Sequence, residues 1–142
     1  MFEFYLNYEE KEALLRLVGY LATSDQEIQD EERKFVRDLA HDLNVSAEGV
    51  FQGLDEDSIT KIAARFERDS AKLVALVELI DLGMVDGEYF AEEKAAVREV
   101  AEAMGVSEDE IEPIEKWVEK GQKWHQEGRE LLGLTGDQKM DV

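Results

Sequence analysis

Residues 25–33 read DQEIQDEER, and residues 86–94 read DGEYFAEEK. The second stretch repeats the first 61 residues further along the chain. The same offset aligns residues 36–46 with residues 97–107, where both copies carry valine, arginine, alanine, valine and serine at equivalent positions. A match of this length indicates one supersecondary unit that is used twice. The sequence therefore predicts a fold built from two related halves.

The residues around the repeat have the pattern of amphipathic helices, with apolar side chains three and four positions apart. Residues 71–83 are apolar around most of the circumference, so this helix is expected at the centre of a bundle. No strand pattern is present. The sequence predicts an all-α, compact bundle of about seven helices. The expected helical segments cover roughly 8–24, 30–43, a short turn capped by Ser46 at 46–51, 55–66, 69–83, 92–104 and a last one from Pro113.

Helix ends also carry recognisable signals. Asn44 and Gly105 are suitable left-handed stops, and Ser107 with Glu110 forms a capping-box pattern. Pro113 follows six residues after that cap, and proline breaks the hydrogen-bond ladder of a helix. We therefore expect a short turn that restarts with Pro113 at its first helical position.

Large aromatic residues at the two ends of the chain can be interpreted in two ways. Trp117 and Trp124 share a stripe with Gly121, Gly128 and Leu131. Burial in the core is the favoured interpretation, because large aromatics dominate burial energetics. If the stripe faces outward instead, the tryptophans would anchor a partner or a second copy of the chain, as in a homodimer, and the glycines would admit a close helix. The amino-terminal residues Phe2, Phe4, Tyr5, Leu6 and Tyr8 are expected to close the edge of the bundle.

Composition limits the class of protein. At 142 residues, with 44% hydrophobic and 36% charged residues, the chain fits a single domain over 1–142 with a polar tail from about 134. It has no cysteine, no signal-peptide pattern and no membrane-spanning run, which favours a soluble cytoplasmic protein. A net charge of −19 disfavours nucleic acid and direct membrane insertion. Cations and proteins with basic surfaces are the expected partners.

Each copy of the repeat places three carboxylates at the same spacing. If each loop curls back over the first turn of the following helix, the three side chains converge on one point. Calcium and magnesium require oxygen clusters of this kind. The predicted metal ligands are Asp25, Glu27 and Glu32 in the first copy and Asp86, Glu88 and Glu93 in the second.

These acidic residues also have an explanation that needs no metal. Glu32 and Glu93 fall near the third helical position, where a carboxylate bonds back to the cap amide and interacts favourably with the helix dipole. Asp25 and Asp86 fit Asx turns. The loops do not follow the twelve-residue calcium loop, because they have no glutamate at position twelve. Spacing alone leaves capping and cation binding open.

The paired loops, the Glu-Glu-basic sequence after each, and the segment GVSEDEI at residues 105–111 followed by Trp117-Val118 resemble the TerB-like family. This family includes the tellurite-resistance protein TerB and the amino-terminal part of some membrane-anchored DnaJ-type cochaperones. The similarity covers roughly residues 14–133. The resemblance implies an all-helical fold of two related halves, with metal-binding residues that carry over as Asp25, Glu32, Asp86 and Glu93. Gln26 stands where the family has glycine, so the second loop fits the pattern better than the first.

Features of an enzyme are missing from the sequence. His41 and His125 are far apart and lack zinc-ligand spacing, and no phosphate loop or nucleophile elbow is present. We therefore expect a non-enzymatic module without an organic cofactor, which binds a divalent cation and associates with stress-response or membrane-linked proteins. A metal-free domain whose acidic face docks on a basic partner is the alternative. A hydrolase with a carboxylate-bound metal is a third, less favoured one.

Overall fold

Every regular element in the described part of the chain is helical, so the all-α class is confirmed. The computed structural model describes residues 2–24, 28, 30–48, 50, 56–85 and 89–134, without the side chains of 56 and 57. One 3₁₀ helix and six α-helices lie within these ranges. They are η1 Glu3–Tyr5, α1 Tyr8–Ala22, α2 Asp30–Leu43, α3 Glu56–Ala63, α4 Asp69–Gly83, α5 Ala91–Met104 and α6 Glu108–Leu131.

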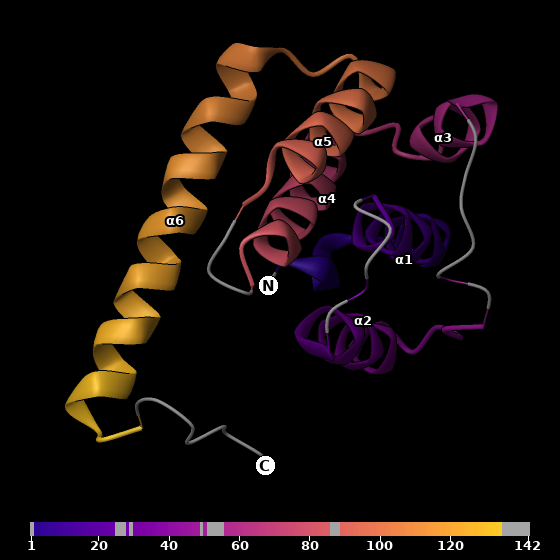
Figure 1. Cartoon of the computed structure of the whole chain (residues 1–142). Helices are drawn as coiled ribbons and strands as arrows, with labels where there is room; N and C mark the ends of the chain where they lie inside the picture. The colour runs from indigo at the N-terminus through magenta and orange to yellow at the C-terminus, as the bar shows by residue number, and fades with distance from the viewer. Residues whose placement is uncertain are drawn as a thin grey trace.

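Helix α4 occupies the centre, as its apolar circumference predicts. It packs against α1, α5, α6 and η1, while α2 packs on α1 and α3 contacts α1 and α5. In Figure 1, α6 runs along the outer side of α4 and α5, and its C-terminal half continues past the end of α4. The result is a bundle of five helices with a sixth, long helix along one side.

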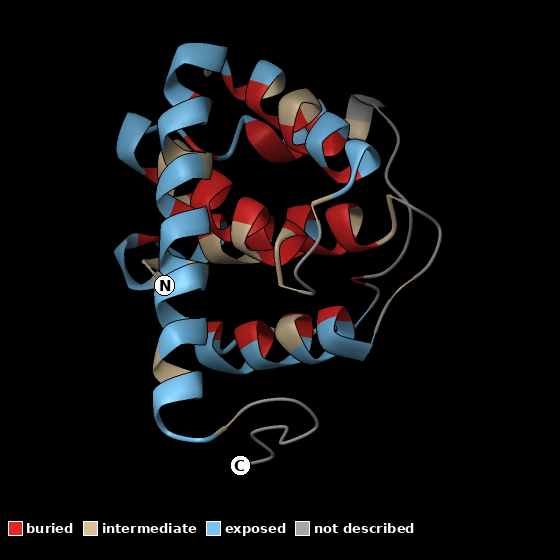
Figure 2. Cartoon of the chain, turned by 60° about the vertical axis from the view of Figure 1, so that its left-hand side comes forward, coloured by how far each residue is buried: buried red, intermediate tan, exposed pale blue. Residues whose placement is uncertain are grey.

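The core consists largely of the residues that the helical pattern predicts. In α1, Leu14, Leu17, Val18 and Leu21 are buried, and all five predicted core positions of α5 are buried as well. Figure 2 shows these buried stripes turned toward the interior, with exposed faces outside. The predicted inward side of α3 is also confirmed, because Ile59, Ile62, Ala63 and Phe66 are buried.

Helices that the 61-residue offset pairs have the same lengths. Helices α1 and α4 each have 15 residues, α2 and α5 each have 14, and the bounds in each pair differ by 61 residues. The predicted left-handed stops also correspond, since Asn44 has φ 56° and Gly105 has φ 76°. At both ends the next residue donates to a carbonyl five residues back, Val45 to Ala40 at 3.0 Å and Val106 to Ala101 at 2.9 Å. Such bonds satisfy carbonyls that a helix end leaves open.

The expected break at Pro113 is wrong, because α6 continues through the proline. Pro113 is the sixth residue of the helix, so its missing N–H removes a single bond close to the N-terminus. Two glutamates on either side of the proline, Glu108 and Glu115, both bind the guanidinium of Arg98 in α5. This shared partner ties the residues before and after the proline to α5.

The favoured core position of the two tryptophans is also wrong. Trp117 is 49% exposed and Trp124 is 76% exposed, because the face of α6 that meets the bundle is the one with Ile111 and Val118. At the amino terminus Leu6 is buried and Phe2 is half-buried, as expected, whereas Phe4, Tyr5 and Tyr8 are exposed. Both ends of the chain therefore present aromatic side chains to solvent.

The expected short turn after Ser46 is seen in the described residues, where the Ser46 hydroxyl accepts from the N–H of Glu48 at 3.2 Å and the N–H of Val50 donates to the carbonyl of Ala47 at 3.2 Å. Residues 49 and 51–55 lie outside the described ranges. The expected polar tail falls largely on residues 135–142, which also lie outside them. Among the described helices, none has both the length and the apolar run needed to cross a membrane.

Candidate functional site

The first acidic loop joins α1 to α2, and the second joins α4 to α5. Four of the six predicted ligands, Asp25, Glu27, Asp86 and Glu88, lie outside the described residues. Glu32 and Glu93 are described, and the structure places each of them in the first turn of its helix, as predicted. Within the described ranges, no group of three or more acidic or histidine side chains is positioned to hold a metal ion.

Glu32 and Glu93 share an unusual degree of burial. Each is only 2% exposed, and they occupy equivalent positions of α2 and α5. Glutamates are rarely buried to this extent, because a carboxylate that loses water needs hydrogen bonds, an ion pair or a metal to offset the loss. Both acidic loops therefore lead into a helix whose first turn holds an inward-facing carboxylate.

The local contacts of Glu93 are consistent with the capping role that its position predicts. Its Oε1 accepts a hydrogen bond of 3.1 Å from the backbone N–H of Phe90, the residue before α5. This bond satisfies one of the amides at the start of the helix. A carboxylate has about four acceptor positions, so a capping bond and a cation are not mutually exclusive.

Gly83, at the end of α4, gives the second loop its close packing. A Cβ added there would lie 2.8 Å from Cε1 of Tyr89 and 3.8 Å from Oε2 of Glu93. The glycine therefore lets the Tyr89 ring rest on α4 beside the Glu93 carboxylate. In the first copy the equivalent of Gly83 is Ala22 and the equivalent of Tyr89 is Ile28, so the first copy lacks this glycine–tyrosine pair.

Tyr89 connects this region to the rest of the bundle. The ammonium of Lys94 lies 5.4 Å from the centre of the Tyr89 ring, within cation–π range. Burial and the neighbouring Glu115 carboxylate raise the pKa of the Tyr89 hydroxyl well above its ordinary value. The hydroxyl therefore stays protonated at neutral pH and acts as a polar, uncharged group.

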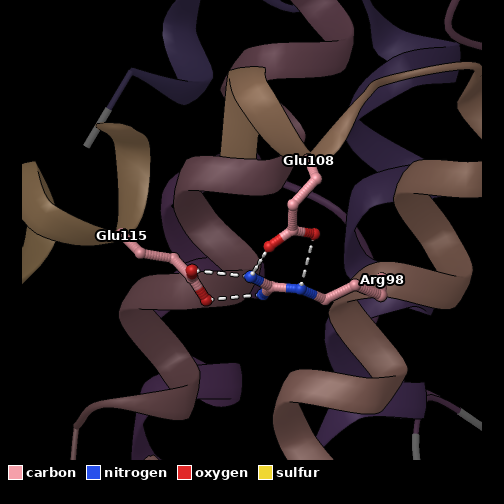
Figure 3. Close-up of polar contacts among 3 residues, drawn as sticks. All are labelled: Arg98, Glu108 and Glu115. Carbon is pink, nitrogen blue, oxygen red and sulfur yellow. Dashed lines mark hydrogen bonds and ion pairs between the residues drawn. The ribbon is translucent and has the colours of Figure 1, made fainter. Parts of the chain in front are cut away.

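Arg98 of α5 binds two carboxylates of α6 at once. Its Nη1 and Nη2 donate to Glu115 at 2.6 and 2.8 Å, and its Nη2 and Nε donate to Glu108 at 2.7 and 3.2 Å (Figure 3). Burial alone would raise the pKa of Glu115, but the hydrogen bonds from Arg98 and the positive charge of its guanidinium hold this pKa below its ordinary value. This two-carboxylate arrangement joins α5 to α6 and is structural in character.

Sequence reasoning missed two other buried carboxylates. Glu10 is 1% exposed, accepts a 2.8 Å bond from the N–H of Asn7 and receives Arg68 at 2.5 Å. The Asn7-x-x-Glu10 spacing is a capping-box signal that could have identified it. Glu78 is also 1% exposed and accepts from the N–H of Phe2 at 3.3 Å, and burial raises its pKa. No local pattern marks Glu78, because its partner lies 76 residues away.

The two histidines are exposed, as expected from their place on polar helix faces. The chain matches no family model, no curated protein and no solved structure. The function is therefore argued from the geometry and the sequence pattern alone.

Proposed function

We propose that this chain is a non-enzymatic TerB-like helical module that binds a divalent cation, calcium or magnesium, at the start of α5. The ligands would be Asp86, Glu88 and Glu93. A second, weaker site would lie at the start of α2, with Asp25, Glu27 and Glu32. Through the loaded loops the module would associate with other proteins in a stress response, including proteins linked to a membrane.

The observation that carries this proposal is the matched burial of Glu32 and Glu93. Each stands at the same helical position after a loop that supplies two more acids at the same spacing. A hard cation of this kind binds oxygen ligands, and a carboxylate held away from bulk water binds it more strongly than one on an open surface. Gly87, in the second loop only, gives that loop the backbone freedom which a tight turn around an ion requires.

As part of the same proposal, we take α1–α2 and α4–α5 to be two copies of one helix–loop–helix unit. The equal helix lengths, the constant offset of 61 residues and the corresponding left-handed stops support this interpretation. Two copies of a cation loop in one domain would then follow from duplication of the unit.

A metal-free interaction domain is the second candidate, and one contact favours it. The 3.1 Å bond from the Phe90 amide gives Glu93 a structural role without any ion. In that case the net charge of −19 would steer the protein toward a basic partner.

Melting experiments with metal ions separate the two candidates. Calcium, magnesium and manganese are titrated at constant ionic strength while the melting temperature is followed. An ion that binds only the folded chain stabilises it by about 2.7 kcal/mol at one hundred times its dissociation constant. Asp86→Asn should remove that response and leave the melting temperature of the metal-free protein nearly unchanged.

Glu93→Gln tests the buried carboxylate itself. Glutamine keeps an oxygen to accept from the Phe90 N–H but has no charge for a cation. The matched control is Glu110→Gln, the same change at the equivalent capping position of α6, where the side chain is exposed. Loss of the metal response in Glu93→Gln but not in Glu110→Gln supports cation binding. No response of the unaltered chain to any of the three ions at millimolar concentration would favour the metal-free domain.

A further inference from the structure

The exposed side of α6 carries an apolar stripe with a regular alternation of large and small residues. We define the α6 stripe as Ile114, Trp117, Gly121, Trp124, Gly128 and Leu131. Successive members are three or four positions apart, the spacing of a seam between two packed helices. Trp117, Trp124 and Leu131 are 49%, 76% and 88% exposed.

Within the described residues, the stripe packs on the bundle only at its N-terminal end, where Ile114 is half-buried against the core and Trp117 makes one edge contact. Helix α6 meets the bundle through Ile111 and Val118, and Gln122 on the same side donates to Asp81 of α4 at 2.9 Å. At 100° per residue, the centre of the α6 stripe lies roughly 120° around the helix from that face. The edge contact joins the rings of Trp117 and Phe2, with 5.8 Å between their centroids.

The two glycines on the stripe are not explained by any contact in this structure. A Cβ added at Gly121 or at Gly128 would meet nothing within 4 Å. Their backbone conformation is helical, so no positive φ demands glycine at either position. Glycine weakens a helix, and its usual benefit on a helix surface is the close approach of another backbone or a bulky ring.

We propose that the α6 stripe binds the α6 stripe of a second copy of this chain in an antiparallel pair. When the two-fold axis passes between residues 122 and 123, each large residue faces a small one. Trp124 then lies opposite Gly121 of the second copy, Trp117 opposite Gly128, and Ile114 opposite Leu131. The stripe is therefore complementary to a second copy of itself that runs in the opposite direction, as an isologous two-fold interface requires.

The charged residues that border the α6 stripe also favour this antiparallel register. Lys120 and Glu127 stand along one border of the stripe, both exposed, and neither has an ion-pair partner in the described residues. In the antiparallel register Lys120 of each copy lies next to Glu127 of the other, so two opposite-charge pairs form. A parallel pair would leave these charges apart.

Overall charge also favours this face for self-association. Two chains of net charge −19 repel each other over most of their surface. Residues 116–129 are an exception, with four basic and two acidic residues. Helix α6 extends past the end of α4 (Figure 1), and in an antiparallel pair its C-terminal half would lie beside the N-terminal half of the second α6. Figure 2 shows that α6 is largely exposed on the side away from the bundle.

Sedimentation equilibrium of the full chain, over protein concentrations from about 1 µM to 1 mM, is the first test, because small interfaces often have micromolar affinities. Both tryptophans of the chain lie on the stripe, so tryptophan emission reports on this surface alone. We expect dimers at the upper concentrations and a shift of the emission to shorter wavelength as they form. A monomer throughout the range would overturn the proposal.

Three variants define the surface. Trp124→Ala should weaken the dimer at least tenfold, whereas Phe4→Ala, which removes an aromatic residue 69% exposed on η1, should not change it. Gly121→Leu fills a position that is open in the single chain. It should leave the melting temperature of the monomer unchanged or higher and still weaken the dimer at least tenfold. A dimer that tolerates both α6 variants would show that another surface is used.

Exchange of the flanking charges tests the direction of the pair. Lys120→Glu and Glu127→Lys should each weaken the dimer, and the double variant should restore it, because the opposite-charge pairs are re-formed in reversed order. Lys123→Glu is the control, since Lys123 already pairs with Glu119 of its own helix at 3.1 Å. Failure of the double variant to recover affinity would rule out the antiparallel register.

Discussion

Two glycines in different helices show how one substitution can have opposite effects. A Cβ on Gly19 of α1 would lie 1.7 Å from the carbonyl oxygen of Val50, so the backbone of Val50 lies directly over this residue. Gly19→Ala should therefore lower the free energy of unfolding by about 1–3 kcal/mol, the range for overpacking a core. Gly121→Ala should raise it by up to about 1 kcal/mol in dilute protein, where the chain is a monomer.

Urea unfolding of both variants measures these changes. A similar shift for the two glycines would contradict the close approach of Val50 to α1. Gly19 lies roughly 150° around α1 from the stripe of Leu14, Leu17, Val18 and Leu21, so the apolar pattern does not place it on the buried side. It is buried because Val50 covers it, and this long-range contact cannot be predicted from local sequence.

Among the helices, α6 depends on charged contacts more than on apolar packing. Only Ile111 and Val118 of its 24 residues are buried, and Arg98 joins α5 to it through Glu108 and Glu115. Loss of the Glu115 charge should therefore lower the free energy of unfolding. We expect Glu115→Gln to reduce the free energy of unfolding at pH 7 by about 1–2 kcal/mol, in line with hydrogen bonds to charged groups.

The effect of Glu115 should depend on pH in a defined direction. The folded-state pKa of Glu115 lies below its ordinary value of 4.5. Its stabilisation is therefore complete above pH 4.5 and is lost as the pH falls through the lower folded-state pKa. The free energies of unfolding of Glu115→Gln and of the unaltered chain should therefore become equal as the pH falls through this acidic range. Glu119→Gln, in an exposed pair, should change stability by less than about 0.5 kcal/mol at any pH.

The helical elements could be predicted well because their signals are local. Apolar spacing located α1, α2, α4 and α5, and Asn44 and Gly105 marked two of their ends. The errors concern α6, where the outcome depends on partners from elsewhere in the chain. Arg98 binds α6 on both sides of Pro113, and α6 packs on α4 through the face with Ile111 and Val118, which leaves the tryptophans exposed. Periodicity identifies a stripe but does not say whether a neighbour covers it.

For the whole molecule, the sequence predicts two acidic loops but not the environment of their carboxylates. Spacing alone identified Glu32 and Glu93, and their deep burial emerges only when α2 and α5 pack into the bundle. Glu10 and Glu78 reach the interior through contacts with Arg68 and with Phe2, which lie far from them along the chain. Burial of an acid is a tertiary property, so a sequence pattern can propose a ligand without revealing its surroundings.

The net charge of −19 should make stability depend on salt in the whole molecule. Mutual repulsion of the excess carboxylates opposes the compact state, and ions screen it over a Debye length of about 10 Å at 0.1 M and about 3 Å at 1 M. Sodium chloride should therefore raise the melting temperature between about 0.01 and 0.5 M and level off at higher concentration. Because this gain needs no specific site, Asp86→Asn should show it in nearly the same amount. A fall in melting temperature with salt would mean that the ion pairs of Arg68 and Arg98 outweigh the repulsion.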